Sequence, residues 1–381
     1  MSSRWTRTLV LIMVVALLAT AAVVVAACGG EEETTTTAAP ETTTTMAPET
    51  TTTMAPETTT TGAPTAMVKK IGVIVPEKAN DYGWNQQHAE AGQKMAEKIG
   101  AEFALADGAG YGDIAPIMRQ LVQDGCDWIM AGASGYMTVA KQVAQETKTV
   151  KVNAIFAQEN TPNILQDIQT YAEQGAYLAG QLAAKTTKTG TVGIVVSADD
   201  ENWTKMSAGF ILAAQATKPD IKIKLAQVGQ AAYADAAAAK RTTETVIAEG
   251  ADVIFGMGDG SSFGMIQAVE TATPPSGADK VWFIDVIGDK TSLDTKGIYL
   301  TSVVWDYLPA WEAAYADIQA GTFGTKTIFI ELKNNGIGII KTQWIADDVW
   351  AEIEATKQAI IDGTIQVPAI SDMNEIKALI Q

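Results

Sequence analysis

The stretch Ile71-Gly72-Val73-Ile74-Val75 begins an alternation of strand-like and helix-like segments that continues through most of the chain. Short β-branched runs of this kind are typical of strands buried in a parallel sheet. The segment that follows, from about Asn85 to Ile99, carries small and apolar residues at three- and four-residue spacing, which predicts an amphipathic helix. Further strands are expected near residues 102–106, 127–131, 151–156, 191–196, 221–227, 251–256 and 281–286.

This alternation predicts an α/β fold built from two doubly wound parallel-sheet lobes. The expected strands fall into two series of similar length, and a globular part that spans residues 67–381 is long enough to bury two cores. Right-handed crossovers bring the loops that follow parallel strands to one edge of a sheet. Functional residues are therefore expected at the carboxyl ends of the strands.

The first 28 residues are typical of an export signal, because Arg4 and Arg7 precede an uncharged run from Leu9 to Ala27. The sequence Val25-Ala26-Ala27-Cys28-Gly29 resembles the bacterial lipobox, which implies cleavage before Cys28 and acylation of this cysteine. The alternative is an uncleaved signal anchor, since a run of this length can span a bilayer. Both interpretations place the globular part outside the cytoplasmic membrane and attached to it.

Residues 29–66 predict a disordered tether. Their eight-residue repeat, Ala-Pro-Glu-Thr-Thr-Thr-Thr-X, is nearly free of large aliphatic side chains and cannot form a core. Regularly spaced proline and β-branched threonine favour extended conformers, which reach on the order of 100 Å at about 3.1 Å per residue. We expect this segment to hold the globular part away from the membrane.

The charge of the chain excludes several classes of partner and cofactor. Of the net charge of −17 over 381 residues, −13 lies in residues 67–381. An acidic surface repels nucleic acid and anionic lipid, so no nucleic acid is expected and the membrane is expected to be contacted only through the lipid anchor. With His88 as the single histidine and no EF-hand spacing, no metal or other cofactor is expected. Cys126 has no partner once Cys28 is acylated, which predicts a buried, inert thiol.

The loops after the expected strands share a chemistry of glycine, aromatic and carboxylate residues. Glycines allow close backbone approach, aromatic rings offer flat apolar faces, and carboxylates accept directional hydrogen bonds. No loop has a Walker or Gly-x-Gly-x-x-Gly sequence, and lysine and arginine are missing from them, so nucleoside triphosphates and dinucleotides are not expected. These loops are residues 80–88, 132–136, 199–203, 256–263 and 288–289.

Four segments within about 67–370 resemble the basic membrane protein family, the substrate-binding lipoproteins of ATP-binding-cassette importers. The order and spacing of the segments carry the resemblance, together with the lipobox and the tether. It implies a type I periplasmic-binding-protein fold with two lobes joined by three crossovers, and purine nucleosides or bases as ligands. The segments are DYGWN at 81–85, EQGAYLAG at 173–180, GADVIFG at 250–256 and IGD at 287–289.

The resemblance also implies lobe boundaries. Lobe 1 is expected to comprise about 67–168 and about 298–322. Lobe 2 is expected to comprise about 169–297 and about 323–381.

The family's ligand contacts are carried over to matching positions. The resemblance implies that Trp84 stacks on the ligand and that Asp81 and Asn85 make adjacent polar contacts. It also implies contacts from the glycine-rich loop, and an aspartate that hydrogen-bonds the ligand at Asp289. Aromatic residues of other strand-end loops complete the set of candidates. The glycine-rich-loop and aromatic candidates are Gly258, Asp259, Tyr136 and Trp203.

One departure from the family concerns the segment 302–306, where nucleoside binders often carry a lysine and this chain has Trp305. A second aromatic ring would sandwich a base, so a free purine base is as credible as a nucleoside. The candidates have structural alternatives, in which Trp84 packs the lobes, Asp81 caps the next helix and Asp289 is a loop carboxylate.

The expected function is that of an extracytoplasmic, lipid-anchored solute-binding protein that delivers an uncharged planar solute to the permease subunits of an ABC importer. No catalysis is expected, because no residue completes a triad with His88, which is interpreted as a surface or second-shell residue. One alternative is a ligand-binding sensor lipoprotein that contacts a receptor kinase. Another is a type I binding protein for a sugar or other small solute.

Overall fold

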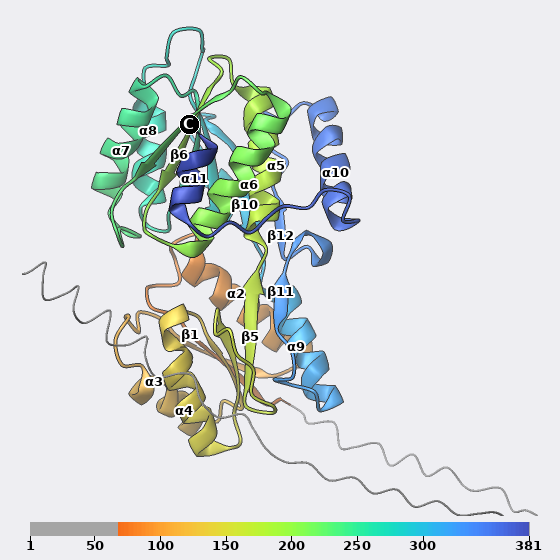
Figure 1. The fold of residues 1–381 in the computed structure, drawn as a ribbon. Coiled ribbons are helices and arrows are strands. Elements are labelled where there is room, and N and C mark those ends of the chain that lie inside the picture. Colours follow the sequence, from red (N-terminus) through yellow and green to blue (C-terminus); the bar gives the residue numbers. More distant parts are fainter. Residues whose placement is uncertain (1–67, 381) are drawn as a thin grey trace, which may run out of the picture. The chain divides into compact units, whose positions relative to one another are not determined.

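The computed structural model describes residues 68–380, so the export signal, Cys28 and the tether lie outside the described part of the chain. Two six-stranded sheets form two α/β lobes, and helices flank each sheet (Figure 1). The first sheet has the strand order β2-β1-β3-β4-β5-β11, and all its neighbours are parallel. No helix among the described residues is long and apolar enough to cross a membrane.

Lobe 1 contains the first sheet and the helices that cover it. Its elements are β1 (Lys70–Ile74), α2 (Trp84–Ile99), β2 (Glu102–Ala106), α3 (Ala115–Gln123), β3 (Trp128–Ala131), η1 (Ser134–Tyr136), α4 (Met137–Thr147), β4 (Lys151–Ile155), β5 (Leu165–Thr170), α9 (Leu308–Ala320) and β11 (Ile328–Ile330).

Lobe 2 contains the second sheet, with the order β7-β6-β8-β9-β10-β12. Its neighbours are parallel except at the edge, where β12 runs antiparallel to β10. Its elements are α5 (Ala172–Thr186), β6 (Thr191–Val196), α6 (Glu201–Thr217), β7 (Lys222–Gln227), α7 (Ala236–Ala248), β8 (Val253–Met257), α8 (Ser262–Thr271), β9 (Trp282–Ile287), η2 (Thr291–Leu293), β10 (Tyr299–Trp305), η3 (Leu332–Asn334), β12 (Ile337–Ile339), α10 (Asp347–Ile361) and α11 (Met373–Leu379).

The chain passes between the lobes three times, as predicted. The crossings lie between β5 and α5, between β10 and α9, and between β11 and β12. The expected second boundary, at about residue 298, differs from the structure because β10 pairs with β9 in lobe 2. The third boundary, expected at about residue 322, also lies later, because β11 pairs with β5 in lobe 1. Lobe 1 is thus 68–170 with 306–331, and lobe 2 is 171–305 with 332–380.

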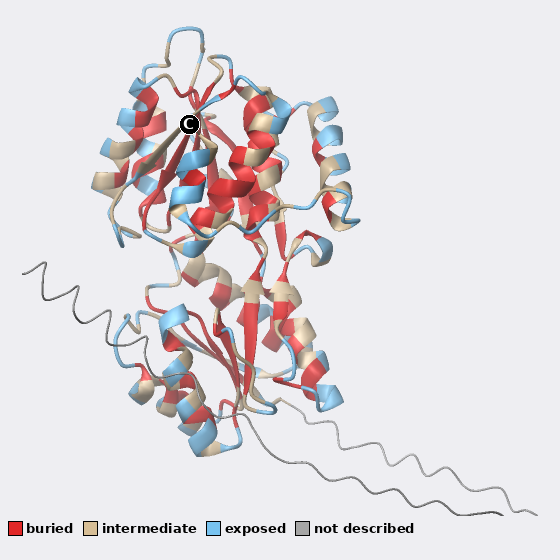
Figure 2. Ribbon diagram, viewed as in Figure 1, coloured by how far each residue is buried: buried red, intermediate tan, exposed pale blue. Residues whose placement is uncertain are grey.

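The strands decide where the cores lie, because their β-branched side chains pack on both faces of each sheet. The strands are largely buried while the outer helix faces are exposed (Figure 2). Gly72 in β1 lies against Cys126, since an added Cβ would stand 3.1 Å from the Cys126 sulfur. Cys126 is buried as predicted, and burial raises the pKa of its thiol to about 11.

Helices α5 and α6 touch backbone to backbone beside the first crossing. A Cβ added to Gly180 of α5 would lie 2.1 Å from the carbonyl oxygen of Phe210. A Cβ added to Gly209 of α6 would lie 2.3 Å from the carbonyl oxygen of Glu173. Gly180, which belongs to the segment 173–180 that resembles the family, therefore allows α5 and α6 to pack closely.

Candidate functional site

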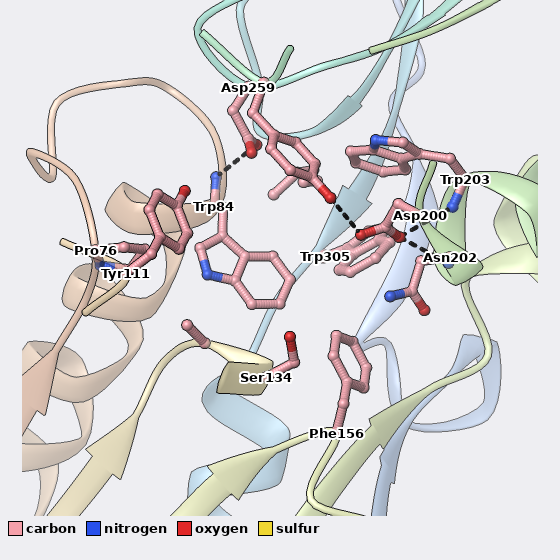
Figure 3. A pocket seen from close by; sticks show the side chains of 13 residues that line it. Pro76, Trp84, Tyr111, Ser134, Phe156, Asp200, Asn202, Trp203, Asp259 and Trp305 are labelled. Carbon is pink, nitrogen blue, oxygen red and sulfur yellow. Dashed lines mark hydrogen bonds between the residues drawn. The ribbon is translucent and has the colours of Figure 1, made fainter. Parts of the chain in front are cut away.

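A cavity of about 110 Å³ lies between the two lobes, at the carboxyl ends of both sheets (Figure 3). Loops from opposite lobes supply its walls, which is the arrangement expected for a ligand that both lobes contact. Lobe 1 contributes Pro76, Trp84, Tyr111, Ala133, Ser134 and Phe156, and lobe 2 contributes Asp200, Asn202, Trp203, Tyr233, Asp259, Ile287 and Trp305.

Trp84 is the first residue of α2, and a hydrogen bond fixes the orientation of its indole. The ring nitrogen Nε1 donates to the carbonyl oxygen of Gly132, 2.7 Å away, at the end of β3. The indole meets Tyr307 edge to face with ring centroids 6.0 Å apart. Figure 3 shows the ring reaching into the cavity near Ser134 and Phe156. The lobe 1 scaffold thus holds one aromatic face ready for a planar ligand.

The aromatic residues of lobe 2 do not form the expected sandwich with Trp84. Trp305 lies 6.0 Å from Trp84 between ring centroids, but the two planes are inclined by 68°. Such an edge-to-face pair leaves no slot for a base between parallel faces. Phe156 lies 5.9 Å from Trp84 at 38°, which makes these two rings the more nearly parallel pair.

Trp305 also lines the cavity, and its buried indole carries a polar group without a partner in the described part of the chain. It ends strand β10, its side chain is 1% exposed, and its Nε1–H has no hydrogen-bond partner among the described residues. The indole of Trp203, by contrast, donates to the Ser197 hydroxyl over 3.1 Å. Because a buried donor without a partner is costly, a ligand acceptor beside Trp305 would be favourable.

Asp259 reaches across the lobe boundary from the loop after β8. Its Oδ1 accepts a hydrogen bond from the backbone amide of Trp84, 3.4 Å away in lobe 1. Burial, reinforced by the negative charge of Asp81, raises the pKa of Asp259 to about 7, although Lys290 opposes the shift. A carboxyl group at this position exchanges its proton near neutral pH.

Asp200 provides the second carboxylate of the cavity and is positioned by its role as a helix cap. Its Oδ1 accepts from the backbone amide of Asn202 at 2.8 Å at the start of α6. Its Oδ2 accepts from the hydroxyl of Tyr233, 2.9 Å away. A carboxylate has about four acceptor positions, so Asp200 keeps capacity for a ligand donor.

Three of the seven described non-glycine residues with positive φ lie at this cavity or in the adjoining loop before α2. Phe156 and Ile287 line the cavity with φ of 56° and 68°, and Tyr82, in the loop before α2, has φ of 53°. The left-handed region is disfavoured for bulky residues and most of all for a β-branched one such as Ile287. Strain of this kind persists where the surrounding structure enforces it, which is common at ligand sites.

Four of the sequence-predicted ligand residues line the cavity, namely Trp84, Trp203, Asp259 and Trp305. The others lie outside its walls. Asp81 caps α2, since its side chain accepts from the backbone amides of Gly83, Asn85 and Gln86 at 3.0–3.1 Å.

Asn85 donates from Nδ2 to Asp81 at 2.7 Å and therefore braces the same turn. Tyr136 is buried and donates from its hydroxyl to the carbonyl oxygen of Gly110. Gly258 leaves room for the Ser261 side chain, because a Cβ at residue 258 would lie 2.1 Å from the Ser261 hydroxyl oxygen. Asp289 is exposed, and its carboxylate accepts from Thr291 in the following turn.

His88 is not at the surface, which corrects one of its two expected positions. Its side chain is fully buried and stacks on Tyr307 with ring centroids 3.9 Å apart and planes inclined by 28°. Burial lowers the pKa of His88 to about 3, so the imidazole is neutral. It supports Trp84 from behind, with 4.7 Å between the two ring centroids.

Several cavity residues were missed by sequence reasoning, including Tyr111, Phe156, Tyr233 and Ile287. Tyr111, Phe156 and Tyr233 lie in loops that follow strands, and Ile287 is the last residue of β9. Position relative to the strand ends is therefore the signal that could have identified them. Three further wall residues, Asp200, Asn202 and Ser134, lie in loops that the sequence predicts to be functional. The sequence pattern did not distinguish these side chains from their neighbours. In the described part of the chain, no group of three or more histidine, cysteine or acidic side chains is arranged to hold a metal ion.

Comparison with known proteins matches residues 68–371 to a family described as "ABC transporter substrate-binding protein PnrA-like". Basic membrane protein D of Borreliella burgdorferi is 24% identical over 79% of this chain and 88% of its own. The ABC transporter nucleoside-binding protein BmpA of Lactococcus lactis is 28% identical over 52% of this chain and 59% of its own.

Among solved structures, the ABC transporter solute-binding protein of Conexibacter woesei superposes with a TM-score of 0.67. The match covers 80% of this chain and 100% of the other at 22% identity. At 22% identity this likeness shows the fold alone. The superposition confirms the predicted two-lobed periplasmic-binding-protein architecture.

Proposed function

The chain belongs to the family of PnrA-like ABC transporter substrate-binding proteins, and we propose that it captures a purine nucleoside or purine base in the cavity between its lobes. Proteins of this family bind a small solute and present it to permease subunits. The family is one of solute-binding proteins and not a class of enzymes. The finer proposal concerns which solute is captured, which residues hold it and how the protein is kept at the membrane.

The observation that carries the proposal is the composition of the cavity wall. Flat aromatic faces from both lobes surround two carboxylates, Asp200 and Asp259. A purine offers a planar ring to Trp84 and exocyclic or ribose donors to the carboxylates. Its ring nitrogens are acceptors, which the unpartnered Nε1–H of Trp305 requires. The nucleoside-binding relative from Lactococcus lactis supports the same ligand class.

The shared cavity also gives a reason for closure. Because the walls come from both lobes, a ligand makes its full set of contacts only when the lobes are together, and it therefore favours the closed form. We propose that the closed form is the one recognised by the permease subunits.

Titration calorimetry with adenosine, inosine, guanosine and adenine tests the ligand class. We expect at least one of these compounds to bind more tightly than the millimolar range. Failure of all four would refute the purine assignment and leave the fold unaffected. Mass spectrometry of small molecules that copurify with the gently prepared protein provides an unbiased second test.

We also propose that Cys28 is acylated and that the protein is held on the extracytoplasmic face of the membrane. The lipobox-like sequence 25–29 is the basis for this proposal, and it lies outside the described residues. Mass spectrometry of the membrane-extracted protein should find a chain that begins at Cys28 and carries added acyl mass. A chain that retains residues 1–27 and carries no acyl mass would instead favour an uncleaved signal anchor.

A further inference from the structure

The cavity carries negative charge without a matching cation in its walls. Of the described residues that line it, Asp200 and Asp259 are acidic, and none is lysine, arginine or histidine. Both carboxylates come from lobe 2 and meet aromatic residues of lobe 1 across the cavity (Figure 3). A neutral ligand can donate hydrogen bonds to these carboxylates, but it brings no positive charge to a site that closure removes from water.

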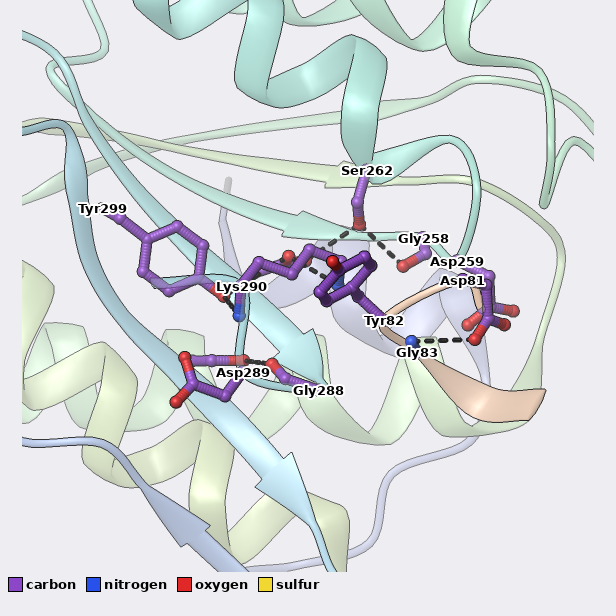
Figure 4. A network of polar contacts seen from close by, with 12 residues as sticks. Asp81, Tyr82, Gly83, Gly258, Asp259, Ser262, Gly288, Asp289, Lys290 and Tyr299 are labelled. Carbon is purple, nitrogen blue, oxygen red and sulfur yellow. Dashed lines mark hydrogen bonds and ion pairs between the residues drawn. The ribbon is translucent and has the colours of Figure 1, made fainter. Parts of the chain in front are cut away.

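Cations in the neighbourhood are already paired with other carboxylates. Lys290, which Figure 4 shows near Tyr299, favours the charged form of Asp259. Its Nζ lies 2.8 Å from Asp285, and both side chains are fully buried. Lys78, in the loop between β1 and α2, lies 2.8 Å from Asp107. Each of these lysines is thus paired with another carboxylate, and Lys290 offsets the negative charge at Asp259 only in part, since the pKa of Asp259 stays raised.

Further carboxylates reinforce the negative field at Asp259. Asp81 and Glu77 of lobe 1 both raise the pKa of Asp259, Asp81 by the larger amount. Glu77 also accepts a hydrogen bond from the hydroxyl of Tyr111 over 3.4 Å. Acidic groups of both lobes therefore converge on the place where the lobes meet.

The remaining wall consists largely of aromatic faces with engaged polar groups. The indole nitrogens of Trp84 and Trp203 donate to Gly132 and Ser197, and the hydroxyl of Tyr233 donates to Asp200. What these rings still offer a ligand is their negative π-faces, and such faces attract cations. The aromatic residues of the wall are Trp84, Tyr111, Phe156, Trp203, Tyr233 and Trp305.

From this juxtaposition of six aromatic rings, two carboxylates and no wall cation, we propose that the preferred ligand carries a positive charge on its planar ring. The proposal deepens the proposed function, on which it rests, by selecting cationic purine nucleosides or bases over neutral ones. It replaces the uncharged solute expected from sequence. The charge would lie beside Asp259 and Asp200, with the ring against Trp84.

Calorimetry with isomeric nucleosides tests the charge directly. 1-Methyladenosine and 7-methyladenosine are cations at neutral pH and place the charge on opposite edges of the ring, whereas N6-methyladenosine carries the same methyl group without charge. We expect at least one cationic isomer to bind ten-fold or more tightly than both adenosine and N6-methyladenosine. Binding of both cationic isomers no tighter than adenosine would overturn the charge proposal while leaving nucleoside capture intact.

Two variants identify the groups responsible. Asp259→Asn and Asp200→Asn should each reduce the ratio of cationic to neutral affinity, while the exposed Asp220→Asn, at the opposite end of the lobe 2 sheet, should leave it unchanged. An unchanged ratio in both cavity variants would contradict the proposal. Circular dichroism confirms that each variant is folded.

A proton count gives a readout that does not depend on affinity. A cation beside Asp259 favours the carboxylate, so binding near pH 6 should release protons, seen as a dependence of the binding enthalpy on the buffer's ionisation enthalpy. Adenosine should release fewer. Tetramethylammonium serves as a cation without a ring: if it alone binds, the site selects charge without a planar ring, so that nucleoside capture and the charged-ring proposal both fail, and if no compound binds, both proposals also fail.

Discussion

The backbone amide of Trp84 donates to the carboxylate of Asp259 over 3.4 Å, joining two residues 175 positions apart on opposite lobes. Trp84 is the first residue of helix α2, so Asp259 approaches the positive end of the helix dipole. The same helix end is already capped from within lobe 1 by Asp81. Closure therefore brings a second carboxylate to an amide cluster that holds one, which accounts for the influence of Asp81 on the pKa of Asp259.

Gly288→Ala should weaken ligand binding by hindering closure. A Cβ at Gly288 would lie 1.8 Å from the carbonyl oxygen of Tyr82 in the other lobe, so the lobes would have to move apart. We expect affinity to fall at least ten-fold, since about 1.4 kcal/mol of lost closure free energy has that effect. Small-angle scattering of the ligand-saturated protein should show a larger radius of gyration.

Gly112→Ala is the matched control for the closure experiment, because an added Cβ there meets no atom within 4 Å. Equal affinity and equal scattering for Gly288→Ala and the wild type would show that the Tyr82 contact is not needed in the bound state.

Trp84→Ala should lower the affinity for a planar ligand by roughly 10- to 100-fold, as expected when a base loses an aromatic partner worth about 1–3 kcal/mol. Trp84→Phe should retain most of the affinity because it keeps a flat face. Calorimetry with the tightest ligand measures both. Trp344→Ala is the control, since this tryptophan is 40% exposed and packs on Trp282 away from the cavity. Full affinity in Trp84→Ala would exclude stacking on this residue.

Glu173→Gln should change how stability depends on pH. Glu173 is 2% exposed, and burial raises the pKa of its carboxyl to about 7. The folded protein thus retains a proton that the unfolded chain releases above about pH 4, so this residue's stabilising contribution is lost as pH rises to 7. Relative to wild type, the variant should gain on the order of 2–3 kcal/mol of unfolding free energy between pH 4 and pH 8.

Urea unfolding at several pH values measures this difference, and the exposed Glu375→Gln serves as its control. Parallel pH profiles for Glu173→Gln and the wild type would mean that the carboxyl is not protonated in the folded state.

Gly180→Ala should destabilise lobe 2, although the same change in an exposed helix stabilises by about 1 kcal/mol. The added methyl group would meet the Phe210 carbonyl at 2.1 Å, and overpacking of this kind costs about 1–3 kcal/mol. Thermal unfolding followed by circular dichroism reports the sign. An increased melting temperature would show that α5 and α6 separate without cost.

Sequence periodicity predicted eight of the twelve strands in the described part of the chain, with ends within two residues of those observed, and missed β5, β10, β11 and β12. It missed β5 because this strand buries polar side chains instead of apolar ones. Gln166 donates to Asp317 over 2.8 Å, and Asp167 accepts from the hydroxyl of Thr327 over 3.1 Å, so long-range partners make these positions tolerable inside. Such partners are not visible in a local pattern.

The candidate site was predictable at the level of loops and less so at the level of side chains. Strand-end position identified the loops of Trp84, Trp203 and Asp259. Whether a carboxylate faces the cavity depends on the turn around it. The carboxylate of Asp81 bonds to the start of its own helix, α2, whereas the carboxylate of Asp259 bonds to the same helix end from the other lobe. Which way a carboxylate points thus depends on contacts between the lobes, and these cannot be inferred from one sequence.

The direct backbone contact between α5 and α6 has a mechanical consequence. Helix α5 starts just after the first crossing, and α6 starts beside Asp200 and Trp203. Since no side chain separates the helices at Gly180 and Gly209, we expect α5 and α6 to move as one rigid body about the crossing. We expect a small change of backbone torsion near residue 171 to bring the acidic and aromatic groups of lobe 2 to Trp84 together. The contacts with a solute would then form cooperatively and not one by one.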